Sequence, residues 1–144
     1  MENTLTVEFR LIGRGFVPKE LSRDLGKECT EYQLGDDRKL TFWILSKTNT
    51  GNIDIKSLSE ELISELQPMQ EKLCRLIEKF DLRPDFCLLL NERPRTSHEV
   101  LYGEHPVINF CIEPATMRFL SAINAPIFIE REYESEEGDS RGRC

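Results

Sequence analysis

Both histidines of the chain lie in one charged stretch, NERPRTSHEVLYGEHP, residues 91–106. A histidine beside carboxylates has a pKa near neutrality and could act as a general acid or base. Histidine and carboxylate side chains are also ligands that zinc accepts. The stretch therefore raises three alternatives: an active site, a metal site, or a solvated loop that presents charge to a partner.

The spacing of these residues disfavours a metal site. HExxH would need a histidine where Tyr102 stands, and HxxEH would need one where Leu101 stands. Gly103 and Pro106 interrupt the continuous helix that would align ligands four residues apart. We therefore predict neither a metal nor any other cofactor, and interpret the stretch as a solvated loop.

Catalytic signatures are missing from the rest of the sequence. No nucleophile motif of the GxSxG kind occurs. GRGFVP resembles a dinucleotide loop, but Pro18 replaces the third glycine of GxGxxG. Arg14 and the start of the next helix could hold an anion, although a plain strand-to-helix turn explains the same residues. We predict no enzyme and no catalytic residues, and a hydrolase built on His98 and His105 is the least favoured alternative.

Composition and charge indicate the class of protein. The 144 residues predict one domain, and 39% hydrophobic and 31% charged residues are typical of globular proteins. The net charge of −7 opposes nucleic-acid binding, because phosphates require a basic surface, and favours a basic protein partner. No window is apolar enough to span a membrane and MENTLTVEFR is no secretory signal, so we expect a cytoplasmic protein without membrane association.

The five cysteines show no metal or redox spacing, since no CxxC pair occurs. Cys74, Cys87 and Cys111 lie inside apolar patterns, which predicts small buried side chains in a reducing compartment. Cys144 is terminal, and we expect it to be exposed.

Hydropathy periodicity predicts the elements that position the charged stretch. Alternating or apolar runs predict strands over 4–12, 29–34, 40–46, 83–91, 106–113 and 125–133. A long helical pattern over 56–80 contains Pro68, which predicts a kink or two helices joined near Gln67, because an interior proline removes a backbone hydrogen bond. Short helices begin at Pro18 and Pro114. Trp43 has apolar neighbours and is predicted to lie in the core.

The order of these elements predicts an α+β fold, a mostly antiparallel sheet with helices packed on one face. RLIGRGFVPKELSRDLGKECTEY and NFCIEPATMRFLSAINAPIFIEREY each predict a strand, a proline-opened helix and a strand, which suggests two ferredoxin-like halves. We predict a single domain over 1–133. Residues 134–144, ESEEGDSRGRC, have no apolar side chain before the final cysteine and are predicted to form an acidic, disordered tail.

Five segments of the chain carry a family resemblance: FVPKELSRDLG, CTEYQLGD, TFWILS, LSEELISELQPMQEKLCRLIEKF and IEPATMRFLSAINAPIFIEREY. In this order, within residues 4–133, they resemble a bacterial family of small proteins known as domain of unknown function 4279. The resemblance implies an α+β fold and no active-site residues. Some members look like immunity proteins, which implies a role in neutralising a toxin. Residues 91–106 depart from the family pattern, in which a shorter connection is expected.

The binding interpretation assigns a partner surface to two groups of residues. Tyrosine and arginine are types that anchor interfaces, and an acidic row attracts a basic partner. Alternation places the glutamates of the last strand and its extension on one face, where they would also discourage edge-to-edge aggregation. The predicted partner-binding residues are Arg93, Arg95, His98, Glu99, Tyr102, Glu104, His105, Glu130, Glu132 and Glu134.

These observations predict an immunity-type protein that binds and neutralises a bacterial toxin without catalysis. The expected partner is a basic toxin domain, because the charge of the chain is acidic. The alternative is a structural or regulatory module that self-associates through its sheet edge and forms a homodimer.

Overall fold

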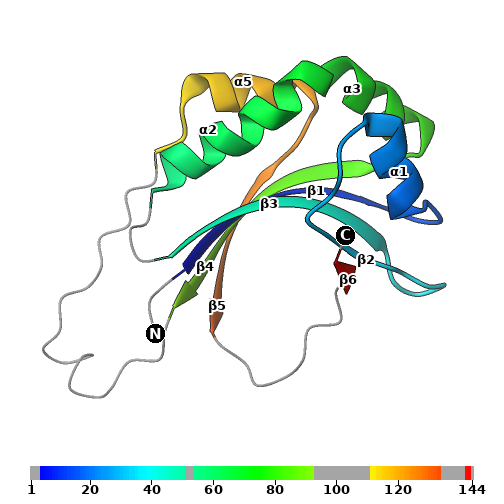
Figure 1. Ribbon diagram of the computed structural model, residues 1–144, viewed down its shortest axis with the longest axis horizontal. Helices are drawn as coiled ribbons and strands as arrows, with labels where there is room; N and C mark the ends of the chain where they lie inside the picture. Colours follow the sequence, from blue (N-terminus) through cyan, green and yellow to red (C-terminus); the bar gives the residue numbers. More distant parts are fainter. Residues whose placement is uncertain (1–3, 51–53, 93–110, 134–141, 144) are drawn as a thin grey trace, which may run out of the picture.

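One curved sheet with helices on one of its faces makes up the fold (Figure 1). The computed structural model describes residues 4–50, 54–92, 111–133 and 142–143. The helices are α1 (Pro18–Leu25), α2 (Ile55–Leu66), α3 (Gln70–Lys79) and α5 (Pro114–Ala122), with the 3-10 turn η1 (Gln67–Met69) between α2 and α3. The strands are β1 (Thr4–Gly13), β2 (Glu31–Gln33), β3 (Thr41–Thr50), β4 (Arg83–Glu92), β5 (Ile127–Tyr133) and β6 (Gly142–Arg143).

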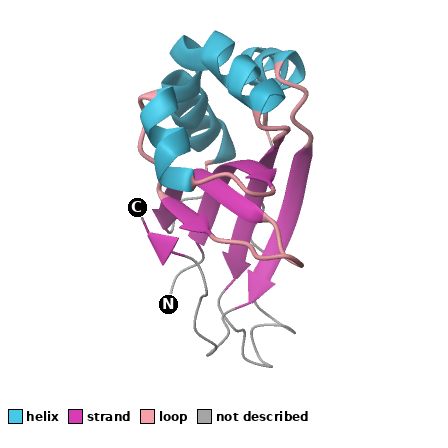
Figure 2. Ribbon diagram, turned by 90° about the vertical axis from the view of Figure 1, so that its right-hand side faces the viewer, coloured by secondary structure: helices cyan, strands magenta, loops and turns pink. Residues whose placement is uncertain are grey.

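The strand order among the described residues is β5-β4-β1-β3-β2-β6. β1 pairs antiparallel with β3 and β4, and β2 pairs antiparallel with β3 and β6. β4 and β5 run parallel, and α5 precedes β5 in the connection between them. Figure 2 shows the helices as a layer on one side of the strands. The predicted α+β class, a mostly antiparallel sheet with helices on one face, is thereby confirmed.

Local sequence signals explain how the helices begin and end. α1 begins at Pro18 and ends at Gly26, whose φ of 73° lies in the left-handed region that glycine adopts without strain. Pro68 lies in η1, where the long helical pattern divides into α2 and α3, as predicted. Asp54 caps α2, because its side chain accepts a hydrogen bond from the backbone N–H of Ser57.

The core lies between the sheet and the helices. Alternate residues of β1 face the helices, and Leu5, Val7, Phe9 and Leu11 are each at most 1% exposed. Trp43 of β3 is fully buried among them, as predicted. Its indole Nε1 donates a hydrogen bond of 2.8 Å to Ser22 Oγ of α1, so the short helix α1 is fixed to the middle of the sheet.

Two predicted segments differ from the structure or fall partly outside it. In the strand expected over 106–113, residues 111–113 form no strand because α5 begins at Pro114, and 106–110 lie outside the described residues. This segment was expected to be the first strand of the second ferredoxin-like half, so the suggestion of two such halves stays a prediction. In the segment 134–144, Gly142 and Arg143 form β6 beside β2, and the other residues lie outside the described part of the chain.

The hydrogen bond between Trp43 and Ser22 predicts a specific loss of stability. We expect Ser22→Ala to lower the free energy of unfolding by about 1–3 kcal/mol, because the buried indole N–H loses its acceptor. Urea unfolding measures the difference, with Lys19→Ala on the exposed side of α1 as the control. Equal unfolding midpoints for Ser22→Ala and the native protein would contradict the role given to this bond.

Candidate functional site

The predicted partner-binding residues are described only in part. Arg93, Arg95, His98, Glu99, Tyr102, Glu104, His105 and Glu134 all lie outside the described residues, so their role stays a prediction. Glu130 is exposed on β5, and Glu132 belongs to the same strand, paired with Asn91 of β4. β5 is at one edge of the described sheet, which is the position where its glutamates would discourage edge-to-edge aggregation.

The same edge strand exposes apolar side chains that the sequence analysis did not single out. Ile127, Phe128 and Ile129 follow one another in β5 and are 37%, 45% and 59% exposed. Within the described residues, β4 is the neighbour of β5, so the outer edge of β5 has no strand beside it. An edge strand of this kind offers backbone hydrogen-bonding groups and apolar contacts at the same place.

The strand register places these side chains on two faces. Cys87 is paired with Glu8, which alternates with the core residues Val7 and Phe9 and therefore lies on the face opposite the helices, which we call the helix-free face. Phe128 is paired with Cys87 and points to the same face. Glu130 is paired with Leu89 and lies on that same face. Ile129 alternates with them and lies on the helix side. The acidic and apolar groups of β5 thus overlap, because Phe128 and Glu130 are neighbours on one face.

A buried ion pair lies on the helix-free face of the neighbouring strands β1 and β4. Arg10 of β1 donates from Nε to Asp85 Oδ1 at 2.6 Å and from Nη2 to Asp85 Oδ2 at 3.1 Å, and the two side chains are 13% and 5% exposed. Burial alone would lower the pKa of Arg10, but the hydrogen bonds and charge of Asp85 outweigh it and the pKa is raised. Two parallel bonds of this kind fix both side chains in one orientation.

Cys87 lies beside this pair and is unsuited to act as a nucleophile. Its side chain is fully buried, and burial raises the pKa of the thiol to about 12, with further contributions from the charges of Glu130 and Glu8. The thiol is therefore protonated at neutral pH, whereas nucleophilic cysteines react as thiolates. The polar groups of this face orient one another and give the face a fixed pattern of charge.

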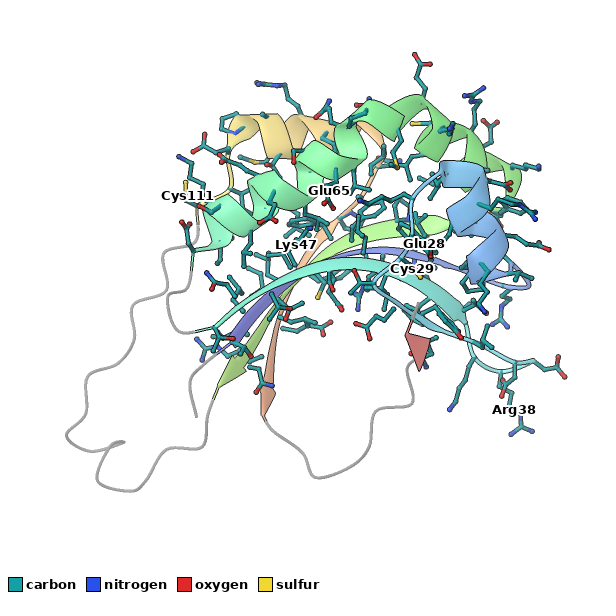
Figure 3. All side chains as sticks on the ribbon, in the orientation of Figure 1. Glu28, Cys29, Arg38, Lys47, Glu65 and Cys111 are labelled. Carbon is teal, nitrogen blue, oxygen red and sulfur yellow. The ribbon has the colours of Figure 1, made fainter. Side chains whose placement is uncertain are left out.

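A second cluster of ionisable groups lies on the helix side and has a structural role. Lys47 of β3 forms ion pairs with Glu65 at 2.9 Å and Glu61 at 3.7 Å, and Lys27 lies 3.5 Å from the other Glu65 oxygen. Figure 3 shows Lys47 rising from β3 towards Glu65 of α2. Each cation of the cluster is matched by a carboxylate, so the cluster ties α2 to the sheet.

The cysteine predictions are corrected in part. Cys87 is buried as predicted, whereas Cys74 and Cys111 are exposed. The prediction for Cys74 is wrong because the buried side of α3 is formed by Leu73 and Leu76. Successive residues of a helix point in directions about 100° apart, so Cys74 points away from that side. Cys111 is exposed before the first turn of α5. Cys144 lies outside the described residues.

Two absences hold for the described part of the chain. It contains no group of three or more histidine, cysteine, aspartate or glutamate residues placed to hold a metal. None of its helices is both long enough and apolar enough to cross a membrane.

The comparisons with known proteins give one match. A family model described as Domain of unknown function (DUF4279) matches residues 3–133. No curated protein and no solved structure matches the chain.

The buried ion pair predicts a large effect when one partner is removed. We expect Asp85→Ala to lower the free energy of unfolding by about 3–5 kcal/mol, because the Arg10 guanidinium then stays buried without its counter-ion. Arg10→Met combined with Asp85→Leu removes both charges and should recover most of that loss. A double-mutant cycle of Arg10→Met, Asp85→Leu and the double variant, followed by urea unfolding, measures the coupling. If the double variant is as unstable as Asp85→Ala alone, shape rather than charge dominates the site.

The Lys47–Glu65 pair predicts a pH dependence of stability. The hydrogen bond from Lys47 lowers the pKa of Glu65 below its usual 4.5, so the stabilisation is complete above pH 4.5 and is lost as the pH falls through the folded-state value. The hydrogen bond to Glu65 raises the pKa of Lys47 above 10.5, so the stabilisation is also lost as the pH rises through that raised value.

The measurement compares Glu65→Gln with the native protein by urea unfolding across pH. At neutral pH we expect a loss of less than about 1 kcal/mol, since the pair is partly exposed and screened by water. The loss should disappear in acid and shrink in high salt. Glu71→Gln, on the exposed side of α3, is the matched control. A loss that is constant over the whole pH range would show that charge pairing is not its cause.

Proposed function

The chain belongs to the family described as Domain of unknown function (DUF4279), and we propose that it is an immunity-type protein that binds and neutralises a basic toxin domain without catalysis. The observation that carries the proposal is the β5 edge, where Ile127, Phe128 and Ile129 are exposed beside a row of glutamates. The immunity role itself rests on the resemblance of some family members to immunity proteins.

The β5 edge is suited to strand addition by a partner. A strand laid along β5 would make backbone hydrogen bonds, which are insensitive to sequence and supply affinity. Phe128 and Ile129 point to opposite faces, so both faces of the added strand would meet an apolar side chain. Large apolar side chains at the centre of an interface contribute most of the binding free energy.

Charge favours a basic partner over other proteins. Glu130 lies next to Phe128 on the helix-free face, and Glu132 and Glu134 follow it in the sequence. With a net charge of −7, the chain would attract a cationic surface and raise the association rate, most strongly at low ionic strength. A toxin domain that acts on nucleic acid has such a surface, because its substrate is a polyanion.

The helix-free face is compatible with a binding role that involves no bond chemistry. Cys87 is held as a protonated thiol, and Arg10 and Asp85 satisfy each other. These buried groups hold β1 and β4 in one arrangement, so the face above them needs little reorganisation on binding, which lowers the entropic cost of association.

Self-association through β5 is disfavoured by its charges. Antiparallel pairing of two copies along all of Ile127–Tyr133 is centred on Glu130, which then lies directly opposite Glu130 of the other copy. Like charges opposite each other destabilise a strand pair. A shorter pairing centred on Phe128 avoids that contact but brings Pro126, which has no N–H, opposite Glu130. We therefore do not propose self-association, and the experiment must distinguish it from toxin binding.

The experiment combines capture with neutralisation. The purified full chain is used as bait in a lysate of the bacterium that produces it, and captured proteins are then expressed singly in a sensitive host. We expect one of them to be basic and toxic, and co-expression of the native chain to restore growth. Phe128→Lys and Glu130→Arg should each lose capture and rescue, because one removes the apolar contact and the other reverses the charge.

The matched control is Met117→Lys. Met117 of α5 is 48% exposed, similar to Phe128, so the substitution makes the same chemical change away from the β5 edge. It should capture and rescue like the native chain. Rescue by Phe128→Lys would contradict the assignment of the β5 edge, and the absence of any toxic protein among those captured would contradict the immunity role. A dimer in light scattering that Phe128→Lys dissociates would replace the proposal with self-association.

A further inference from the structure

A hollow lies at the end of the sheet where β1 ends and β4 begins. Its volume is about 370 Å³, within the range of small-molecule sites. It is lined by Ile12, Gly13, Arg14, Leu40, Phe80, Asp81, Leu82 and Arg83. We call it the α3–β4 pocket, because three of these residues form the connection between α3 and β4 and a fourth, Arg83, is the first residue of β4.

Strand pairing brings the three lining segments together. Ile12 is paired with Arg83 of β4, and Gly13 is paired with Thr41 of β3, which follows Leu40. The pocket is therefore built on the most extensively paired part of the sheet, although its residues are far apart in the sequence.

The turn after α3 has the backbone conformation that opens the pocket. Asp81 has a φ of 51°, in the left-handed region that aspartate tolerates better than most residues, and Leu82 N donates to Ile77 O at 2.9 Å. Gly13 leaves room for the Leu82 side chain against the end of β1, because a Cβ at position 13 would lie 2.8 Å from Leu82 Cδ2. The shape of the pocket thus follows from a glycine and a tight helix end.

The lining combines an apolar floor with a charged rim. Ile12 and Leu82 are 4% and 6% exposed and form the floor, whereas Arg14, Asp81 and Arg83 are exposed. Two arginines against one aspartate give the rim a net charge of +1, although the chain as a whole carries −7. Among the described residues, neither Arg83 nor Asp81 forms an ion pair.

From this lining we propose that the α3–β4 pocket binds a small organic monoanion, a carboxylate attached to an apolar body. The carboxylate is held by the planar guanidinium groups of Arg14 and Arg83, which match its two oxygens. Arg14 uses Nη1 for the Asp37 carbonyl oxygen at 3.4 Å and has further N–H donors for a ligand. The apolar body lies against Phe80 and Leu82. Asp81 disfavours a second negative charge, so a phosphate dianion is bound less well than a carboxylate.

The site is separate from the surface proposed for the toxin. Arg83 is the first residue of β4, whereas the acidic part of β5 is paired with the last residues of β4, at the opposite end of the sheet. The inference therefore neither requires the immunity role nor supports it.

The test uses 4-phenylbutyrate as the probe, with 4-phenylbutanol as its uncharged counterpart and phenyl phosphate as the dianion. The full chain, labelled with ¹⁵N, is titrated with each compound and followed by amide chemical shifts. We expect saturable shifts confined to the amides of residues 12–14, 40 and 80–83 with 4-phenylbutyrate. The alcohol should bind at least about tenfold more weakly, because it lacks charge-assisted hydrogen bonds, and phenyl phosphate should also bind more weakly.

Two arginine variants make the result specific. Arg83→Gln should weaken the binding of 4-phenylbutyrate about tenfold or more, whereas Arg118→Gln, an exposed arginine of α5, should leave it unchanged. Arg83 is exposed, so its replacement is expected to leave the fold intact. Shifts that do not saturate, shifts centred elsewhere, or equal binding by Arg83→Gln would overturn the proposal. Tighter binding of phenyl phosphate would overturn the choice of a carboxylate.

Discussion

The fold depends on one constraint: β1 is paired on both sides, so each of its side chains lies in the middle of one sheet face or the other. On the helix side this constraint selects apolar residues that form the core. On the helix-free face it places Arg10 where water has little access, and a buried guanidinium requires a counter-ion. Asp85 supplies it from the neighbouring strand, in direct register with Arg10. The pair therefore favours one register of β4 beside β1, because a shift of β4 by one residue would turn Asp85 to the helix side.

Most helices and strands were predicted correctly, because the physical effect behind each sequence pattern acts between residues that are close in the sequence. Alternation in β1 predicts a strand with one buried side, and Pro68 predicts the division of the long helix, because both effects act within one element. The apolar surroundings of Trp43 predicted its burial correctly. The prediction that Cys74 is buried was wrong because it rested on the apolar residues around it in the sequence, whereas burial on a helix depends on the angle around the helix axis.

The features that the sequence did not predict depend on contacts between residues that are far apart in the sequence. Apolar runs such as Ile127–Ile129 are usually buried in the middle of a sheet, and the same run is exposed when its strand lies at the edge. Which strand lies at the edge follows from the pairing of the whole sheet, and no residue within β5 encodes it. The α3–β4 pocket was also beyond sequence reasoning, since Arg14 and Arg83 line one pocket only because β1 and β4 are paired. Residues 91–106, in contrast, could be named as a candidate site from the sequence, because their ionisable side chains lie in one continuous segment.

The two proposed sites, the α3–β4 pocket and the β5 edge, lie at different places on one sheet. β4 connects them, with Arg83 at one end and the partners of Glu130 and Glu132 towards the other. Its ten residues span roughly 30 Å, and β1 and β5 pair with it on either side. Coupling between distant sites requires an element with two alternative arrangements, and a strand held on both edges has one register. We therefore expect a carboxylate bound in the α3–β4 pocket to leave the β5 edge unchanged.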